Sequence, residues 1–366
     1  MADKLIIGQL DPTSSCGNFC KHCGDSSLPN GQAMPLEDIE AIFTSGFFGI
    51  SGVANSQMFA LAGGGDPTAY VHGFVELIRL LSSFAPSILV LTGGVSRQLT
   101  LQQLRKVNTL CSTGVKINFT INHHPFGSNG HDARIKKTLL MFRDSGILGW
   151  TLRVRCIPEE LAVHVDRAIK HTFPYMTRAN FERSDLWRWI NKKFGVIFMA
   201  SPLKMYLGAA SYNTTKPPLI LEYNEDSLRC SGRALTLPRI LLSGTTTTRN
   251  VEAMLALAPQ LYVHPLRVTY DGFVTGCESS RFPRTDFFEG DLYGHNYDEI
   301  RSNRLLFIEH LISESRRWLR SHTSESGTIC DTVCRRAREA FIDDPKRFPS
   351  HRGHGNTVLK ARALVR

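Results

Sequence analysis

Strand-like and helix-like segments alternate along the first half of the chain. The short apolar runs, which are typical of buried strands, are Leu5–Leu10, Gln57–Leu61, Ile88–Leu91, Val115–Ile121 and Thr151–Cys156. Apolar residues at helical spacing lie between them, over Pro35–Phe48, Tyr70–Phe84, Gln98–Cys111 and Ala133–Ser145. The predicted buried stripe of the second helix is Val71, Phe74, Val75, Ile78 and Leu81. This rhythm is typical of parallel βαβ units and by itself fits a barrel and a doubly wound sheet equally well.

The second half of the chain is less regular. Asp271-Gly272 separates two β-rich runs, Leu266–Tyr270 and Phe273–Gly276, and this arrangement is typical of a hairpin turn. The other elements that we expect are a strand at Leu219–Tyr223 and helices over Ile300–Leu319 and Thr332–Phe341.

Composition excludes general disorder, because 42% of the 366 residues are hydrophobic and 21% are charged. The length predicts one large α/β domain with a smaller appendage. Apolar stretches such as Ser87–Leu91 and Gly195–Ala200 are far shorter than the ~20 residues that a membrane span requires. The first ten residues lack the long apolar region of a signal peptide, so we expect a cytoplasmic protein without a membrane partner.

The net charge of +10 comes from 43 basic and 33 acidic residues. The densest basic positions are Arg316, Arg317, Arg320, Arg335, Arg336 and the tail from Lys346 to Arg366. They form either a solvated basic face or a surface for an anionic substrate or partner. Because the other basic residues are spread out, we do not expect nucleic acid as a partner.

The cysteines carry the strongest chemical signal. Nine cysteines without an export signal argue against a disulfide framework, and Cys16, Cys20 and Cys23 form a C-x3-C-x2-C loop directly after the first strand. Iron–sulfur clusters usually take four cysteines, so three leave one iron open to a small molecule. The alternatives are three structural thiols or a zinc site, for which His22 is adjacent but crowded between two ligands.

This loop resembles the signature of the radical SAM superfamily, with His22 where an aromatic residue usually precedes the third cysteine. The resemblance implies a [4Fe-4S] cluster on Cys16, Cys20 and Cys23, whose open iron S-adenosylmethionine chelates. It implies reductive cleavage of that cofactor to methionine and a 5′-deoxyadenosyl radical. Over residues 4–235 it also implies an α/β fold, a partial (β/α)6 TIM-like barrel of parallel strands. A smaller C-terminal α+β extension is expected to follow this core.

A second motif closes the second predicted strand. Gly63-Gly64-Gly65-Asp66-Pro67 resembles the family's Gly-Gly-Glu-Pro motif and follows the cysteine loop by one βα unit. The resemblance implies that Gly64 and Gly65 approach the cofactor's methionine moiety and that Asp66 receives its ammonium group. Asp66 is one methylene shorter than the usual Glu.

Two further strands carry weaker matches to cofactor-binding positions. Thr120 and Asn122 end the fourth strand, where relatives present polar groups to the cofactor's ribose. Arg153 and Arg155 alternate with apolar residues and therefore share one face of the fifth strand. If that face looks into a barrel, one of them pairs with the cofactor's carboxylate; if it looks outward, both are surface arginines.

The C-terminal region resembles a reduced SPASM or twitch extension. Gly232-Arg233-Ala234 after Cys230 matches a segment common in such proteins. The remaining cysteines that suffice for one auxiliary iron–sulfur cluster are Cys230, Cys277, Cys330 and Cys334. The alternative is an extension without a cluster, in which a thiol such as Cys277 donates a hydrogen atom. Cys111 and Cys156 are expected to be core cysteines.

The expected domain divisions of the chain are a radical SAM core at 1–235, the extension at 236–345 and a basic, mobile tail at 346–366.

Together these features predict a radical SAM enzyme with a flavodoxin- or ferredoxin-type electron donor. The first strand starts almost at Met1 and leaves no room before it for a leader-peptide module, which favours a small-molecule substrate. A sugar, aminoglycoside or nucleoside would undergo epimerisation, dehydrogenation or rearrangement. The alternative is a maturase of a ribosomal peptide. The alternative from another class is a non-catalytic metal- or nucleic-acid-binding protein.

Overall fold

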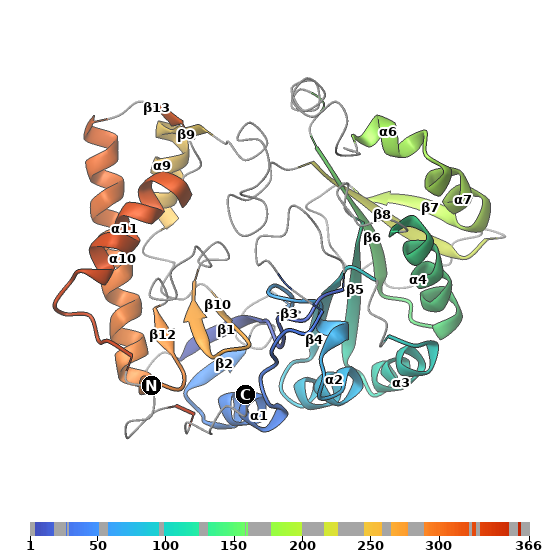
Figure 1. Cartoon of the computed structure of the whole chain (residues 1–366), viewed down its shortest axis with the longest axis horizontal. Coiled ribbons are helices and arrows are strands. Elements are labelled where there is room, and N and C mark those ends of the chain that lie inside the picture. Colours follow the sequence, from blue (N-terminus) through green and yellow to red (C-terminus); the bar gives the residue numbers. More distant parts are fainter. Residues whose placement is uncertain are drawn as a thin grey trace.

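The structure is a computed structural model (Figure 1). It describes residues 4–17, 27, 29–50, 58–94, 99–123, 131–157, 159, 177–199, 216–225, 245–257, 265–276, 289–321, 324–326, 330–350 and 358–359. None of the helices in these ranges is both long and apolar enough to cross a membrane.

One open sheet forms the centre of the molecule (Figure 1). Its order is β12-β11-β10-β1-β3-β4-β5-β6-β8-β7, with β2 also paired to β1. The bounds are β1 Leu5–Leu10, β2 Phe48–Ile50, β3 Phe59–Leu61, β4 Ser87–Thr92, β5 Lys116–His123, β6 Trp150–Cys156, β7 Gly195–Met199, β8 Pro218–Glu225, β10 Leu266–Val268, β11 Phe273–Thr275 and β12 Gly290–Asp291. All pairs from β10 to β7 are parallel, and only the β10–β11 and β11–β12 pairs are antiparallel. The predicted α/β class, with the parallel strands of a partial TIM-like barrel, is confirmed.

The helices that follow the parallel strands cover one side of this sheet (Figure 1). They are α1 Leu36–Thr44, α2 Phe74–Ser82, α3 Leu101–Cys111, α4 His131–Ser145, α6 Arg178–Glu182 and α7 Asp185–Lys193. Phe119 of β5 shows how the layers meet, because its ring lies 6.2 Å from that of Phe74 in α2 and 4.9 Å from that of Phe142 in α4. The other face of the sheet is therefore free of these helices.

Two glycines move element boundaries away from the predicted positions. Helix α2 begins at Phe74 rather than Tyr70, because Gly73 before it has φ of +100°, which a helix cannot contain. Val71 is consequently 64% exposed, and its predicted place in the buried stripe is wrong. Helix α1 ends at Thr44, followed by Gly46 at φ +77°, and Phe48 starts β2 instead of ending a helix.

The C-terminal strands extend the same sheet, since β10 lies parallel to β1. The predicted hairpin is confirmed, and Gly272 takes φ of +85° in its turn against the ring of Tyr293. The remaining elements are α9 Thr248–Leu257, α10 Tyr297–Ser321, α11 Arg335–Ile342 and a two-stranded sheet of β9 Thr245–Thr247 and β13 Ser324–Ser326. The three helices lie together (Figure 1) and share a second core that includes Val251, Trp318 and Phe341.

Part of the expected mobile tail is packed. The backbone N–H of Val358 donates to His295 (3.0 Å) and that of Leu359 to Leu292 (2.8 Å), and Leu359 is 2% exposed. This segment therefore lies against the residues that follow β12. The expected division at residue 235 falls outside the described residues and stays a prediction.

Candidate functional site

The cysteine-bearing loop is tied together at its base, directly after β1. The Ser14 backbone N–H donates to the Gln32 carbonyl oxygen (2.8 Å), and the Ser15 hydroxyl donates to the Gly31 carbonyl oxygen (3.0 Å). Cys16 follows at once and is half-buried. The other two predicted ligands, Cys20 and Cys23, lie outside the described residues, as does their neighbour His22.

Both ends of this loop contact the Gly63–Asp66 segment, which follows β3. The Asp66 backbone N–H donates to the carbonyl oxygen of Ser15 at the loop's start (2.8 Å). At its far end the hydroxyl of Ser27 donates to the carbonyl oxygen of Gly64. A Cβ at Gly65 would overlap the backbone of Ser15, so this close approach requires glycine. The two sequence motifs therefore meet at the carboxyl ends of neighbouring parallel strands.

The carboxylate of Asp66 holds two segments together. It is 4% exposed, and its carboxylate accepts hydrogen bonds from the Thr68 N–H (3.0 Å) and hydroxyl (2.7 Å). It also accepts from the Thr92 hydroxyl (2.8 and 2.9 Å to its two oxygens) and the Gly93 N–H (2.8 Å) at the end of β4. This carboxylate thus links the ends of β3 and β4, and its predicted contact with an ammonium group stays a prediction.

The first strand is followed directly by a buried acid, Asp11, that sequence reasoning missed. Asp11 is fully buried, and its Oδ2 accepts from the Gly64 N–H (3.1 Å) and from Arg267 Nε (2.6 Å), while Oδ1 accepts from Gln9 Nε2 (2.9 Å). Arg267, on β10, is 4% exposed. The only sequence signal was an acid next to the apolar run Leu5–Leu10, which is equally typical of a turn.

The predicted polar residues of β5 and β6 share the sheet face that lacks helices. Leu152 and Val154 join the main core with the helices, so the alternating Arg153 and Arg155 lie on the opposite face. Register places Asn122 beside Arg153. The polar residues of this face include Asn118, Thr120, Asn122, Thr151, Arg153, Arg155, Glu222 and Asn224. Of the two orientations left open for the arginines, the inward one is observed.

Two side chains of this polar face form an ion pair, and two others carry unsatisfied acceptors. Arg153 Nε lies 3.1 Å from Glu222 Oε2, with the residues 8% and 4% exposed. The side-chain carbonyl oxygens of Asn122 and Asn224 are buried and have no hydrogen-bond partner. Each such acceptor costs about 1–3 kcal/mol unless a donor reaches it. The face therefore suits a ligand that carries hydrogen-bond donors such as hydroxyl or amino groups.

The cysteines proposed for an auxiliary cluster are only partly described. Cys230 and Cys277 lie outside the described residues, and Cys334 ends a π-helical turn with its Sγ 3.7 Å from the Sδ of Met254 in α9. Within the described ranges no three His, Cys, Asp or Glu side chains are grouped to hold a metal. Cys156 belongs to the main core, and burial raises the pKa of the half-buried Cys111 thiol at its edge.

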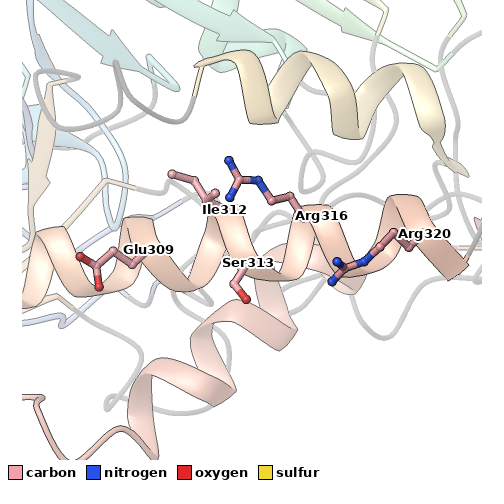
Figure 2. Close-up of a pocket in the computed structure, with 5 residues that line it drawn as sticks. All are labelled: Glu309, Ile312, Ser313, Arg316 and Arg320. Carbon is pink, nitrogen blue, oxygen red and sulfur yellow. The ribbon is translucent and has the colours of Figure 1, made fainter.

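A groove on α10 is separate from this site. It has a volume of about 430 Å³ and is lined by Glu309, Ile312, Ser313, Arg316 and Arg320, all from one helix (Figure 2). The guanidinium groups of Arg316 and Arg320 do not converge on one point (Figure 2). The groove holds none of the predicted site residues, and its side chains form no reactive arrangement.

Comparison with known proteins assigns no family. No protein-family model matches the chain, and no curated protein matches it. Among solved structures it is similar to that of Streptococcus suis SuiB bound to its precursor peptide SuiA, with 14% identity and a TM-score of 0.36. The match covers 76% of this chain and 60% of SuiB, so the chain spans less than two thirds of that protein. A similarity this low assigns neither family nor activity.

Proposed function

We propose that this protein is a radical SAM enzyme. The observation that carries the proposal is the hydrogen bonding of both ends of the cysteine loop, at Ser15 and Ser27, to the Gly63–Asp66 segment. The two motifs are separated by about one βα unit in sequence, yet they are adjacent in space at the carboxyl edge of parallel strands, where active sites of barrel folds lie. When bound, the cluster supplies the electron that cleaves S-adenosylmethionine to methionine and a 5′-deoxyadenosyl radical.

In this proposal the thiolates of Cys16, Cys20 and Cys23 hold the cluster, and a donor set of sulfur suits iron. His22 lies beside the third ligand in sequence. The backbone of Gly64 and Gly65 borders the cofactor's amino-acid end, where Asp66 keeps the segment in place and is the predicted acceptor for the ammonium group. The polar groups proposed for the rest of the cofactor are Thr120, Asn122, Arg153 and Arg155.

The same geometry weighs against a closed structural zinc site. Such a site requires four ligands that are satisfied within the protein, with no need for a polar face beside it. Here the cysteine loop starts at the carboxyl end of β1, in the sheet whose helix-free face carries the unsatisfied acceptors of Asn122 and Asn224. Those acceptors are accounted for by a ligand with several hydrogen-bond donors.

Anaerobic reconstitution of the whole chain with iron and sulfide tests the proposal. We expect about four irons per chain for one cluster and about eight if the remaining cysteines bind a second. Incubation with S-adenosylmethionine and dithionite should then yield 5′-deoxyadenosine, measured by chromatography. A colourless zinc protein that never cleaves the cofactor would contradict the proposal.

A pair of cysteine variants provides the matched control. Cys16→Ala removes a proposed ligand and should abolish cofactor cleavage. Cys111→Ala removes another half-buried cysteine, at the end of α3, and should leave cleavage within about twofold of wild type because its thiol is kept protonated by burial. Equal effects of the two changes would remove the basis for assigning Cys16 to the cluster.

For the substrate, a ribosomal peptide stands beside the small molecule first expected. SuiB was solved with a precursor peptide, so the peptide class has a precedent that the small-molecule class lacks. The similarity is too low to assign a peptide substrate to this chain. Incubating the reconstituted protein with peptides encoded beside its gene, and separately with sugar or nucleoside candidates, decides between them. The true substrate raises 5′-deoxyadenosine formation above the substrate-free rate and is converted to a product that differs from it in chromatographic retention or in mass.

A further inference from the structure

We propose that Asp11 and Arg267 form a positioning pair that sets the backbone of Gly63 and Gly64, so that the C-terminal strand β10 is an integral part of the cofactor site. The inference rests on the proposed function, which it extends from the N-terminal motifs to a residue 256 positions away. Neither residue belongs to the cysteine loop or to the Gly63–Asp66 segment.

The pair is rigidly built. Arg267 donates to Asp11 through both Nε, at 2.6 Å, and Nη2. The Asp11 backbone N–H also donates to the carbonyl oxygen of Val268 (2.8 Å), which follows Arg267 on β10. Both side chains are at least 96% buried, because they are 0% and 4% exposed. A charge-assisted pair in this environment is strongly attractive, and it allows little rotation of either side chain.

The pair acts on the glycine segment through one carboxylate. Gly63 has φ of +88°, and a Cβ there would overlap the Asp11 carboxylate, so the acid and the glycine are in direct contact. The next amide, of Gly64, donates to Asp11 Oδ2, while its own carbonyl oxygen accepts from Ser27. Gly64 is thus held at its N–H by the end of β1 and at its carbonyl by the far end of the cysteine loop. Arg267 keeps the carboxylate aimed at Gly64.

A positioning role predicts a specific kinetic pattern. Asp11→Asn keeps the shape of the side chain and removes its charge, and Arg267→Gln removes the opposing charge. In each reconstituted variant we expect S-adenosylmethionine to bind about tenfold or more weakly, measured by equilibrium dialysis. The iron content and the cleavage rate at saturating cofactor should stay near wild type. Arg267→Lys, which retains the charge, should recover part of the affinity.

Glu289→Gln is the matched control. It breaks a second buried ion pair, in which Glu289 Oε2 lies 2.6 Å from Arg304 Nη1, and leaves Gly63 and Gly64 untouched. This change should lower stability and leave the affinity for S-adenosylmethionine unchanged.

If Asp11→Asn or Arg267→Gln alone fails to fold, the double variant that combines them leaves no unpaired charge and should show the same loss of affinity. A folded variant of the pair with wild-type affinity and hydrogen exchange overturns the proposal.

Hydrogen exchange separates this inference from the proposed function. In apoprotein, which needs no cluster or cofactor, Asp11→Asn should raise the exchange of the peptide that covers residues 62–68 at least severalfold, because the Gly64 amide loses its charged acceptor. Unchanged exchange there overturns the positioning role, even if wild type cleaves S-adenosylmethionine. Faster exchange in a protein that never binds the cofactor would retain the structural pair and reject its role in cofactor binding.

Discussion

Gly65→Ala is the most direct test of the contact between the two motifs. The new Cβ would overlap the Ser15 carbonyl oxygen and lie 2.7 Å from the carbonyl carbon of Ser14 and the backbone N of Ser15. These are backbone atoms of a segment that is itself hydrogen-bonded to Gln32, so they cannot swing aside as a flexible side chain would.

The expected cost follows from these contacts. Overpacking in a dense region costs about 1–3 kcal/mol. Separating the segments also weakens the bond from the Asp66 N–H to the Ser15 carbonyl, which contributes about 0.5–1.5 kcal/mol. We therefore expect the free energy of unfolding to fall by about 2–4 kcal/mol, out of the 5–15 kcal/mol typical of a domain.

Urea denaturation of the purified chain measures this loss, and 5′-deoxyadenosine formation by the reconstituted variant measures its effect on the site. Gly114→Ala is the control. Gly114 has φ of +99°, and a Cβ there would meet nothing within 4 Å, so only backbone strain of about 1–2 kcal/mol is expected. It precedes β5, at the opposite edge of the sheet, so cofactor cleavage should persist. Wild-type stability and cleavage in Gly65→Ala would refute the close packing of the motifs.

Three further predictions follow from buried polar groups. Burial lowers the pKa of His123 from 6.5 to about 4. The free energy of unfolding should therefore fall by about 3 kcal/mol as the pH drops from 6.5 to 4. His123→Leu should remove most of this pH dependence in urea denaturation. Thr92→Val removes the hydroxyl that donates to the Asp66 carboxylate and should lower the free energy of unfolding, measured by urea denaturation, by about 1–3 kcal/mol; a wild-type value would contradict this. Burial raises the pKa of Glu289, but Arg304 and Arg338 outweigh this and hold the pKa below its usual value. Lowering the pH from 5 to 3 should therefore reduce the free energy of unfolding more in wild type than in Glu289→Gln, measured by urea denaturation at each pH.

Local sequence determined the elements whose signal is apolar patterning. The first strand, Leu5–Leu10, has the predicted bounds, and β6 begins one residue earlier than expected, at Trp150. The side chains of these strands that face the helices are apolar, so the strands stand out against the flanking turns even where, as in β6, the other face is polar. Helix starts were less predictable, because the φ of Gly73 depends on how the preceding turn packs.

The cysteine loop and the Gly63–Asp66 motif could also be recognised from sequence, since each is a compact set of neighbouring residues. Tertiary structure alone decided what holds them together. Asp11 meets Arg267 across 256 residues, and no local pattern encodes a pairing that arises only when β10 docks beside β1. The orientation of Arg153 and Arg155 was likewise open in the sequence. Alternation shows that the two side chains share one face of the strand, but it does not show which face the helices cover.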